Sequence, residues 1–154
     1  MRKLFALLIP ILLLSGCLGS DESIQEPQEE IVMLEQHFDN HSHQFWNTHP
    51  MSMANTSIIT FNNSGDLNFS LDLIAKFHEP VLWEQGYLNY SLVYENETIW
   101  SIEATTHPQE IHYMNMSNIT GSLTVQVQAS GSDNQADEEP GDYFVAIATF
   151  DLKY

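Results

Sequence analysis

The fold class of this chain is decided by the stretch LNFSLDLIAK, residues 67–76. Apolar and polar side chains alternate along it, and only Ile74 interrupts the polar side. Because successive side chains of a β-strand point to opposite faces, this period of two predicts a half-buried strand. The side chains that such a strand would bury are those of Leu67, Phe69, Leu71, Leu73 and Ala75.

The same alternation recurs along the rest of the chain. Clear cases are residues 88–94 and 123–129, and shorter candidates are residues 57–61, 98–103 and 110–115. The last run, residues 142–152, is apolar on both faces, as expected of a central strand. Residues 31–36 fit the start of either a helix or a strand, and no convincing helical periodicity follows them.

Turn-forming residues separate these runs. They predict turns or loops at residues 63–66, 95–97, 107–108, 118–121 and 130–141. Seven or eight short strands with this spacing predict an all-β fold, namely a single antiparallel β-sandwich of jelly-roll-like topology.

The N-terminus carries a segment of another kind. Arg2 and Lys3 precede the eleven residues Leu4–Leu14, which have no charged or hydrogen-bonding side chain. This order of basic and apolar residues is typical of an export signal. The alternative is a transmembrane helix, but the apolar run is shorter than the roughly 20 residues that such a helix needs.

The sequence LSGC, residues 14–17, resembles the lipobox of prokaryotic secretory lipoproteins. The resemblance implies that Cys17 is diacylated and becomes the first residue of the mature protein. Residues 1–16 are then the signal peptide, residues 17–35 the lipidated cysteine with a disordered acidic tether, and residues 36–154 the β-sandwich domain. We therefore expect a protein anchored by lipid to the extracytoplasmic face of the cell membrane.

The chain is strongly acidic, with a formal net charge of −17. Without the signal peptide, only Lys76 and Lys153 oppose 21 acidic residues. Such a surface repels phosphate backbones and anionic lipid head groups, which excludes nucleic acid as a partner and leaves the lipid anchor as the membrane contact. Colloidal solubility alone also explains this acidity.

Asparagine usage gives a second strong pattern. Eight asparagines begin an Asn-x-Ser/Thr sequon, which is more than this composition would produce by chance. In an exported chain they predict N-glycosylation at many surface points, and a lipobox with dense sequons is most typical of an archaeal cell-surface protein. The alternative is that asparagine simply fills turns. The candidates are Asn40, Asn55, Asn62, Asn68, Asn89, Asn96, Asn115 and Asn118.

The C-terminal third resembles the end of the bacterial pre-peptidase C-terminal domains and of the related P-domains beside secreted proteases. The resemblance is carried by GSLTVQV at residues 121–127, ASG at residues 129–131 and GDY at residues 141–143, followed by an apolar strand. It implies a jelly-roll fold and an accessory module that binds surfaces, polymers or calcium and does no chemistry.

Histidine and methionine side chains form one candidate metal site. Imidazole suits zinc or copper and thioether suits copper, and these groups gather at His37, His41, His43, His49, Met51 and Met53. His41 and His43 would point the same way on a strand and could chelate a metal together. The interleaved aromatic residues equally fit a structural role, as a first strand or as a loop that covers the sandwich.

A calcium site is a further candidate in the acidic loop. Calcium binds carboxylate and carbonyl oxygens, and Asp133, Asp137 and Asp142 could supply several of them. The loop lacks a D-x-D-x-D-G motif, so the alternative is a solvated acidic connection between two strands.

Exposed aromatic rings are candidates for binding sugars. The aromatic candidates are Trp46, Trp83, Tyr87 and Trp100; of these we expect only Trp83 to be exposed, and Trp100 to lie in the core beside Ile102. No G-x-S-x-G, H-E-x-x-H, phosphate-binding glycine loop or cysteine nucleophile is present, so we expect no catalysis.

Together these patterns predict a non-catalytic binding or display module on the cell surface, with extracellular protein or polysaccharide as its partner. One alternative is an extracytoplasmic copper- or zinc-binding lipoprotein that uses the His37–Met53 cluster. The other is a calcium-dependent adhesion or carbohydrate-binding module.

Overall fold

Six β-strands account for most of the residues that the computed structural model describes, which are 32–78, 85–105, 107–133 and 141–154. The signal peptide, Cys17 and most of the acidic tether lie outside the described residues. Within the described part, no helix has the length and hydropathy needed to cross a membrane. The strands are β1 (Leu34–Gln44), β2 (Met51–Lys76), β3 (Tyr87–Tyr94), β4 (Glu97–Ala104), β5 (His107–Gly131) and β6 (Tyr143–Lys153).

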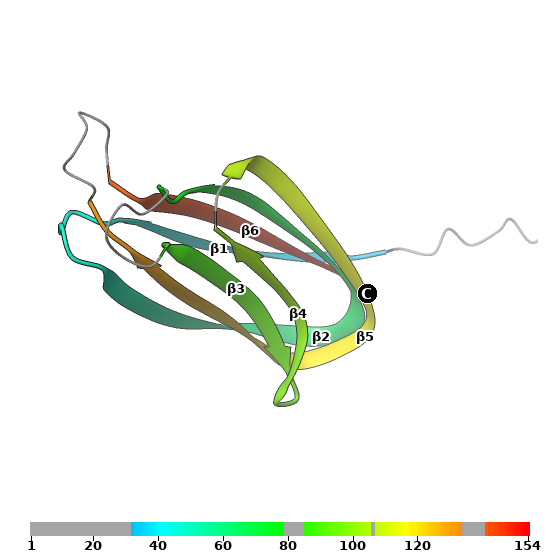
Figure 1. Cartoon of the computed structure of the whole chain (residues 1–154). Coiled ribbons are helices and arrows are strands. Elements are labelled where there is room, and N and C mark those ends of the chain that lie inside the picture. Colours follow the sequence, from blue (N-terminus) through cyan, green and yellow to red (C-terminus); the bar gives the residue numbers. More distant parts are fainter. Residues whose placement is uncertain (1–31, 79–84, 106, 134–140) are drawn as a thin grey trace, which may run out of the picture. The chain divides into compact units, whose positions relative to one another are not determined.

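All six strands join one antiparallel sheet in the order β1-β6-β2-β5-β3-β4. β2 and β5 are 26 and 25 residues long and pair with each other along most of their length. Figure 1 shows both strands curving sharply together, so that the sheet folds over on itself.

This folding divides the sheet into two layers. The first layer contains β1, β6, residues 66–76 of β2 and residues 107–116 of β5. The second layer contains residues 51–61 of β2, residues 121–131 of β5, β3 and β4. Each layer therefore has four strand segments, and the prediction of an all-β, jelly-roll-like antiparallel sandwich is confirmed. Its eight segments belong to six continuous strands.

The turns predicted at residues 63–66 and 118–121 are wrong as connections between strands, because these residues are the bends within β2 and β5. The register of β2 against β5 shifts on both sides of Gly65, and Asn118 and Gly121 have φ angles of +57° and +80°. The bend in β5 uses positive φ angles as a turn does, and both bends contain the Asn and Gly residues typical of turns, so local sequence does not distinguish a bend from a turn.

Residues 107–108, also predicted as a turn, are the first residues of β5. The two-residue turn between β3 and β4 is confirmed at Glu95 and Asn96, which have φ angles of +50° and +66°. Positive φ at both positions is the geometry of a type I′ hairpin. β6 is central as predicted, since it pairs with β1 on one side and β2 on the other.

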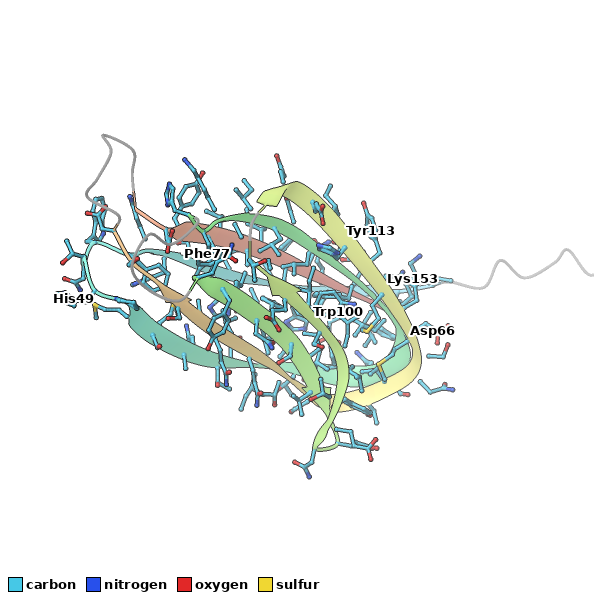
Figure 2. All side chains as sticks on the ribbon, viewed as in Figure 1. His49, Asp66, Phe77, Trp100, Tyr113 and Lys153 are labelled. Atoms are coloured by element: carbon cyan, nitrogen blue, oxygen red, sulfur yellow. The ribbon has the colours of Figure 1, made fainter. Side chains whose placement is uncertain are left out.

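Gly65 allows the end of the chain to pack against the bend. A Cβ atom at Gly65 would lie 2.1 Å from the backbone oxygen of Lys153, so no side chain fits there. The next residue, Asp66, pairs with Lys153, and Figure 2 shows both residues at the bend.

The core lies between the two layers and follows the alternation in the sequence. The predicted inward residues of 67–76 are at most 3% exposed. Rings from both layers meet there: the centroid of Phe69 lies 5.2 Å from that of Trp100 and 6.5 Å from that of Tyr90. The predicted position of Trp100 is confirmed, because it packs against the core together with Ile102.

Candidate functional site

The inward face of β1 is polar, although it faces the core. Glu35, His37, Asp39 and His41 alternate with exposed residues and are all at least half-buried. β1 is an edge strand of the first layer, and the edge of the second layer opposite it is residues 51–61 of β2. The polar side chains therefore lie where the sandwich closes.

Hydrogen bonds from β1 to β2 form what we call the polar seam, made by Glu35, Asp39 and His41 with Asn55, Ser57, Asn62 and Asn63. At one end of the polar seam, Glu35 accepts hydrogen bonds from the backbone N–H and the side-chain amide of Asn62, both at 3.3 Å. The Asn63 amide donates to Glu35 at 3.4 Å. The His37 ring lies 2.9 Å from Glu35, and this hydrogen bond lowers the pKa of the Glu35 carboxyl.

The other end of the polar seam is centred on Asp39. His41 Nε2 lies 2.8 Å from Asp39 Oδ2, and Ser57 Oγ donates to the same oxygen at 2.8 Å. Asn55 Nδ2 lies 3.2 Å from His41 Nδ1. If Asn55 donates there, the imidazole proton is on Nε2 and points to Asp39.

This arrangement holds an aspartate, a histidine and a serine together, but not in catalytic order. A serine nucleophile needs its hydroxyl on the imidazole nitrogen that takes its proton. Here the Ser57 hydroxyl is on Asp39, and both imidazole nitrogens of His41 are occupied by Asp39 and Asn55. The geometry suits a structural clamp between the layers.

Tyr90 lies next to this clamp inside the sandwich. Its side chain is fully buried, and its ring centroid is 6.4 Å from that of His41. Within the described part of the chain, its hydroxyl has no hydrogen-bond partner. Burial, and secondly the charge of Asp39, raises the pKa of the Tyr90 hydroxyl well above its ordinary value.

The histidines of the predicted copper or zinc site are spread along β1 and the connection to β2. His37 and His41 contact Glu35 and Asp39, and the His43 ring packs edge-on against Phe45 with centroids 4.7 Å apart. Figure 2 shows His49 at the end of the molecule away from the bend. Among the described residues, no group of three or more His, Cys, Asp or Glu is arranged to hold a metal ion. Copper or zinc binding stays a prediction, and thermal unfolding with each metal tests it.

Asp142, a residue of the predicted calcium site, is only 2% exposed and connects two segments of the chain by hydrogen bonds. Its Oδ1 accepts hydrogen bonds from the backbone N–H of His78 at 2.7 Å and from its ring Nδ1 at 2.9 Å. Its Oδ2 accepts from the backbone N–H of Ser132 at 2.9 Å. Asp133 is half-buried beside it, and Asp137 lies outside the described residues.

An open pocket of about 430 Å³ lies where the end of β1 meets the start of β6. Trp46, two residues after the end of β1, is 70% exposed at this pocket. The other lining residues are Ser42, His43, Gln44, Tyr143, Phe144 and Val145. It therefore combines an exposed indole with hydroxyl, amide and imidazole groups.

The loop that carries Trp46 is held from both sides. Phe45 is buried, and its backbone N–H donates to the carbonyl oxygen of Asp142 at 2.8 Å. The backbone N–H of Asp133 donates to the carbonyl oxygen of Asn47 at 2.6 Å. The residues flanking Trp46 are thus fixed, and the pocket is a defined part of the fold.

The other predicted aromatic candidates are not part of this pocket. Trp83 lies outside the described residues, Trp100 is committed to the core, and Tyr87 is 36% exposed on β3. The prediction that Trp83 alone is exposed is wrong, because Trp46 is exposed at this pocket. Tyr143 also lines the pocket; it lies 97 positions from Trp46 in the sequence, and the pairing of β1 with β6 brings it there. The period-two pattern Glu35-x-His37-x-Asp39-x-His41 would have revealed the polar seam.

All eight sequons fall within the described residues. Six of the asparagines are exposed, and Asn68 and Asn89 are half-buried on the polar side of their strands. The exposed ones are Asn40, Asn55, Asn62, Asn96, Asn115 and Asn118.

Comparisons with known proteins add a similarity of architecture. No protein-family model and no curated protein matches this chain. Among solved structures, one match is the carbohydrate-binding module TmCBM61 in complex with β-1,4-galactotriose. It is 12% identical to this chain with a TM-score of 0.46, and the match covers 81% of this chain and 90% of the module. The module CBM36, in complex with calcium and xylotriose, is 14% identical with a TM-score of 0.33, covering 79% and 99%.

A third match is the dimeric latent PorU of Porphyromonas gingivalis, 11% identical with a TM-score of 0.42, covering 78% of this chain and 13% of that one. At these identities the likeness concerns the arrangement of strands and says nothing of a ligand.

The Tyr90→Phe substitution should leave the free energy of unfolding unchanged or raise it at neutral pH, because it removes a buried hydroxyl without a partner. Because burial raises the pKa of Tyr90 in the folded state, this residue ionises first in the unfolded chain. The free energy of unfolding of the parent protein therefore falls as the pH rises above about 10. The variant should flatten that alkaline decline. Urea unfolding at neutral and alkaline pH measures both effects, with exposed Tyr113→Phe as control. A loss above about 1 kcal/mol at neutral pH contradicts this account.

The Asp142→Asn substitution should lower the free energy of unfolding by about 3 kcal/mol without added calcium, because buried N–H donors lose a charged acceptor. Asp133→Asn keeps its backbone bond to Asn47 and should change little. Denaturant unfolding with and without calcium measures this. If calcium stabilises the parent protein and Asp133→Asn removes that gain, the loop is a calcium site and Asp142 is more than a clamp.

Proposed function

We propose that this protein is a non-catalytic carbohydrate-binding module, anchored by lipid on the extracytoplasmic face of a prokaryotic cell membrane. One observation carries the proposal: Trp46 is 70% exposed at an open pocket on a fixed loop. An indole this exposed forgoes the free energy that burial of its apolar surface would give, which favours a role outside the core.

The chemistry of the pocket suits a sugar. A pyranose ring has an apolar C–H face that packs against an aromatic ring, whose face is electron-rich. Its hydroxyl groups need donors and acceptors beside that ring, and Ser42, His43 and Gln44 supply both kinds. Tyr143 adds a second aromatic ring to the same pocket.

The charge of the chain favours a neutral sugar polymer. A net charge of −17 repels anionic polysaccharides at a distance, whereas an uncharged glycan approaches freely. Neutral polysaccharides are therefore the first ligands to test.

The lipid anchor would hold the module near the cell. Two acyl chains on Cys17 suffice for stable membrane attachment. A coil of residues 18–30 would let the sandwich stand roughly 20 Å from the membrane surface. The acidic body would be repelled by anionic head groups and so face outward.

The Trp46→Ala substitution should weaken binding to a neutral polysaccharide at least about tenfold, because it removes the stacking surface. It should leave the melting temperature unchanged, since the side chain is mostly exposed. Affinity electrophoresis or calorimetry against soluble galactan and xylan, then a wider neutral panel, measures the change. Ile58→Ala, exposed on β2 and outside the pocket, is the control. Equal binding by the Trp46→Ala and parent proteins would sink the proposal.

The Cys17→Ser substitution should release the protein from the membrane, because it removes the thiol that carries the lipid. Triton X-114 partitioning of full-length protein from its native cells should move from the detergent phase to the aqueous phase. Trp46→Ala should stay in the detergent phase. Mass spectrometry that finds an unmodified Cys17 in the parent protein would exclude the anchor.

A further inference from the structure

Two aromatic side chains stand exposed on the outer face of the first layer, away from the Trp46 pocket. Phe38 on β1 is 61% exposed, and Tyr113 on β5 is 71% exposed. Figure 2 shows Tyr113 on the outside of the curved sheet. Neither ring belongs to the core or lines the pocket.

Both rings precede a sequon asparagine by two residues. Phe38 precedes Asn40, and Tyr113 precedes Asn115. Residues two apart on a strand share a face and lie about 6.6 Å apart. Aromatic residues are 11% of the chain, so about one of the eight sequons should have such a neighbour by chance, but four have one.

The four differ in what the ring can do. Tyr94, before Asn96, is held by its own fold, since its hydroxyl donates to the carbonyl oxygen of Thr120 at 3.0 Å. Tyr87 is only 36% exposed and Asn89 is half-buried. Only Phe38–Asn40 and Tyr113–Asn115 combine a freely exposed ring with an exposed asparagine.

The register places these two pairs at opposite edges of the layer. Phe38 pairs with Thr149 of β6, which pairs with Ser70 of β2, which pairs with Tyr113 of β5. Among the described strands, nothing pairs with the outer edge of β1 or of residues 107–116 of β5. Each asparagine therefore has open space beside it for a bulky group.

We propose that Asn40 and Asn115 are N-glycosylated and that the first sugar of each glycan lies on Phe38 and Tyr113. N-glycosylation at these two sites requires that the chain is exported. It does not require that the Trp46 pocket binds a sugar. The apolar face of the attached sugar covers the ring, which removes exposed apolar surface from water. The glycan is thereby ordered along the strand, and the outer face is shielded.

Other sequons are used by the fold in ways that disfavour a glycan. Asn55 Nδ2, the attachment atom, lies 3.2 Å from buried His41, and Asn62 Nδ2 donates to Glu35 in the polar seam. Asn68 is half-buried on the central strand β2 and pairs directly with Asn115. A glycan on Asn115 therefore crowds the position above Asn68.

Glycopeptide mass spectrometry of full-length protein from its native membranes tests the sites. We expect sugar on Asn40 and Asn115, and none on Asn55, Asn62 or Asn68. An unmodified Asn40 or Asn115, or sugar on Asn68 instead of Asn115, overturns the proposal. A lipidated Cys17 on the same protein shows that export took place, so a failure here is distinct from a failure of the anchor.

A double-mutant cycle tests the stacking. Phe38→Ala should lower the melting temperature of glycosylated protein by about 4 °C and should have little effect in an Asn40→Gln background. Ile111→Ala is the matched control, because Ile111 is exposed on the same face without a sequon asparagine two residues on. It should change the melting temperature equally in both backgrounds. Equal effects of Phe38→Ala in both backgrounds would show that the sugar does not lie on the ring.

Discussion

The structure depends on the paired bend of β2 and β5. Two strands of 26 and 25 residues leave one layer and enter the other together, so their pairing is kept while the sheet folds over. Gly65 permits it, since a Cβ atom would meet the backbone of Lys153 at 2.1 Å, and Gly121 supplies a positive φ angle in β5. Without the bend, the alternating apolar faces would have no partner to bury against.

The bend leaves an open side, and the polar seam closes it. β1 and the first half of β2 are edges of different layers, and side chains rather than backbone groups join them through Glu35, Asp39 and His41. Charged residues that point inward on an edge strand also discourage pairing with other chains. β1 therefore serves three tasks: its inner face closes the sandwich, its outer face carries Phe38 and Asn40, and its end leads into the Trp46 pocket.

Much of the fold could be predicted from local pattern, and less of the site. Leu67, Phe69 and Leu71 are buried as the alternation required, and the type I′ turn at residues 95–97 is where its residues indicated. Local sequence does not distinguish the bends at residues 63–66 and 118–121 from connections between strands, because both contain the Asn and Gly residues typical of turns. The sequence makes Asp142 a candidate calcium ligand, yet its oxygens accept hydrogen bonds from residues 10 and 64 positions away in the sequence.

The sequence by itself determined the all-β class, the strand faces, the acidic surface and the candidate lipobox and sequons. Each of these depends on residue types and short spacings, which are local properties. Only the tertiary structure decided that Asp39 meets Ser57, that Trp46 shares a pocket with Tyr143, and that Asn68 faces Asn115. These contacts join residues 18 to 97 positions apart, and they depend on which strands become neighbours when the long hairpin bends.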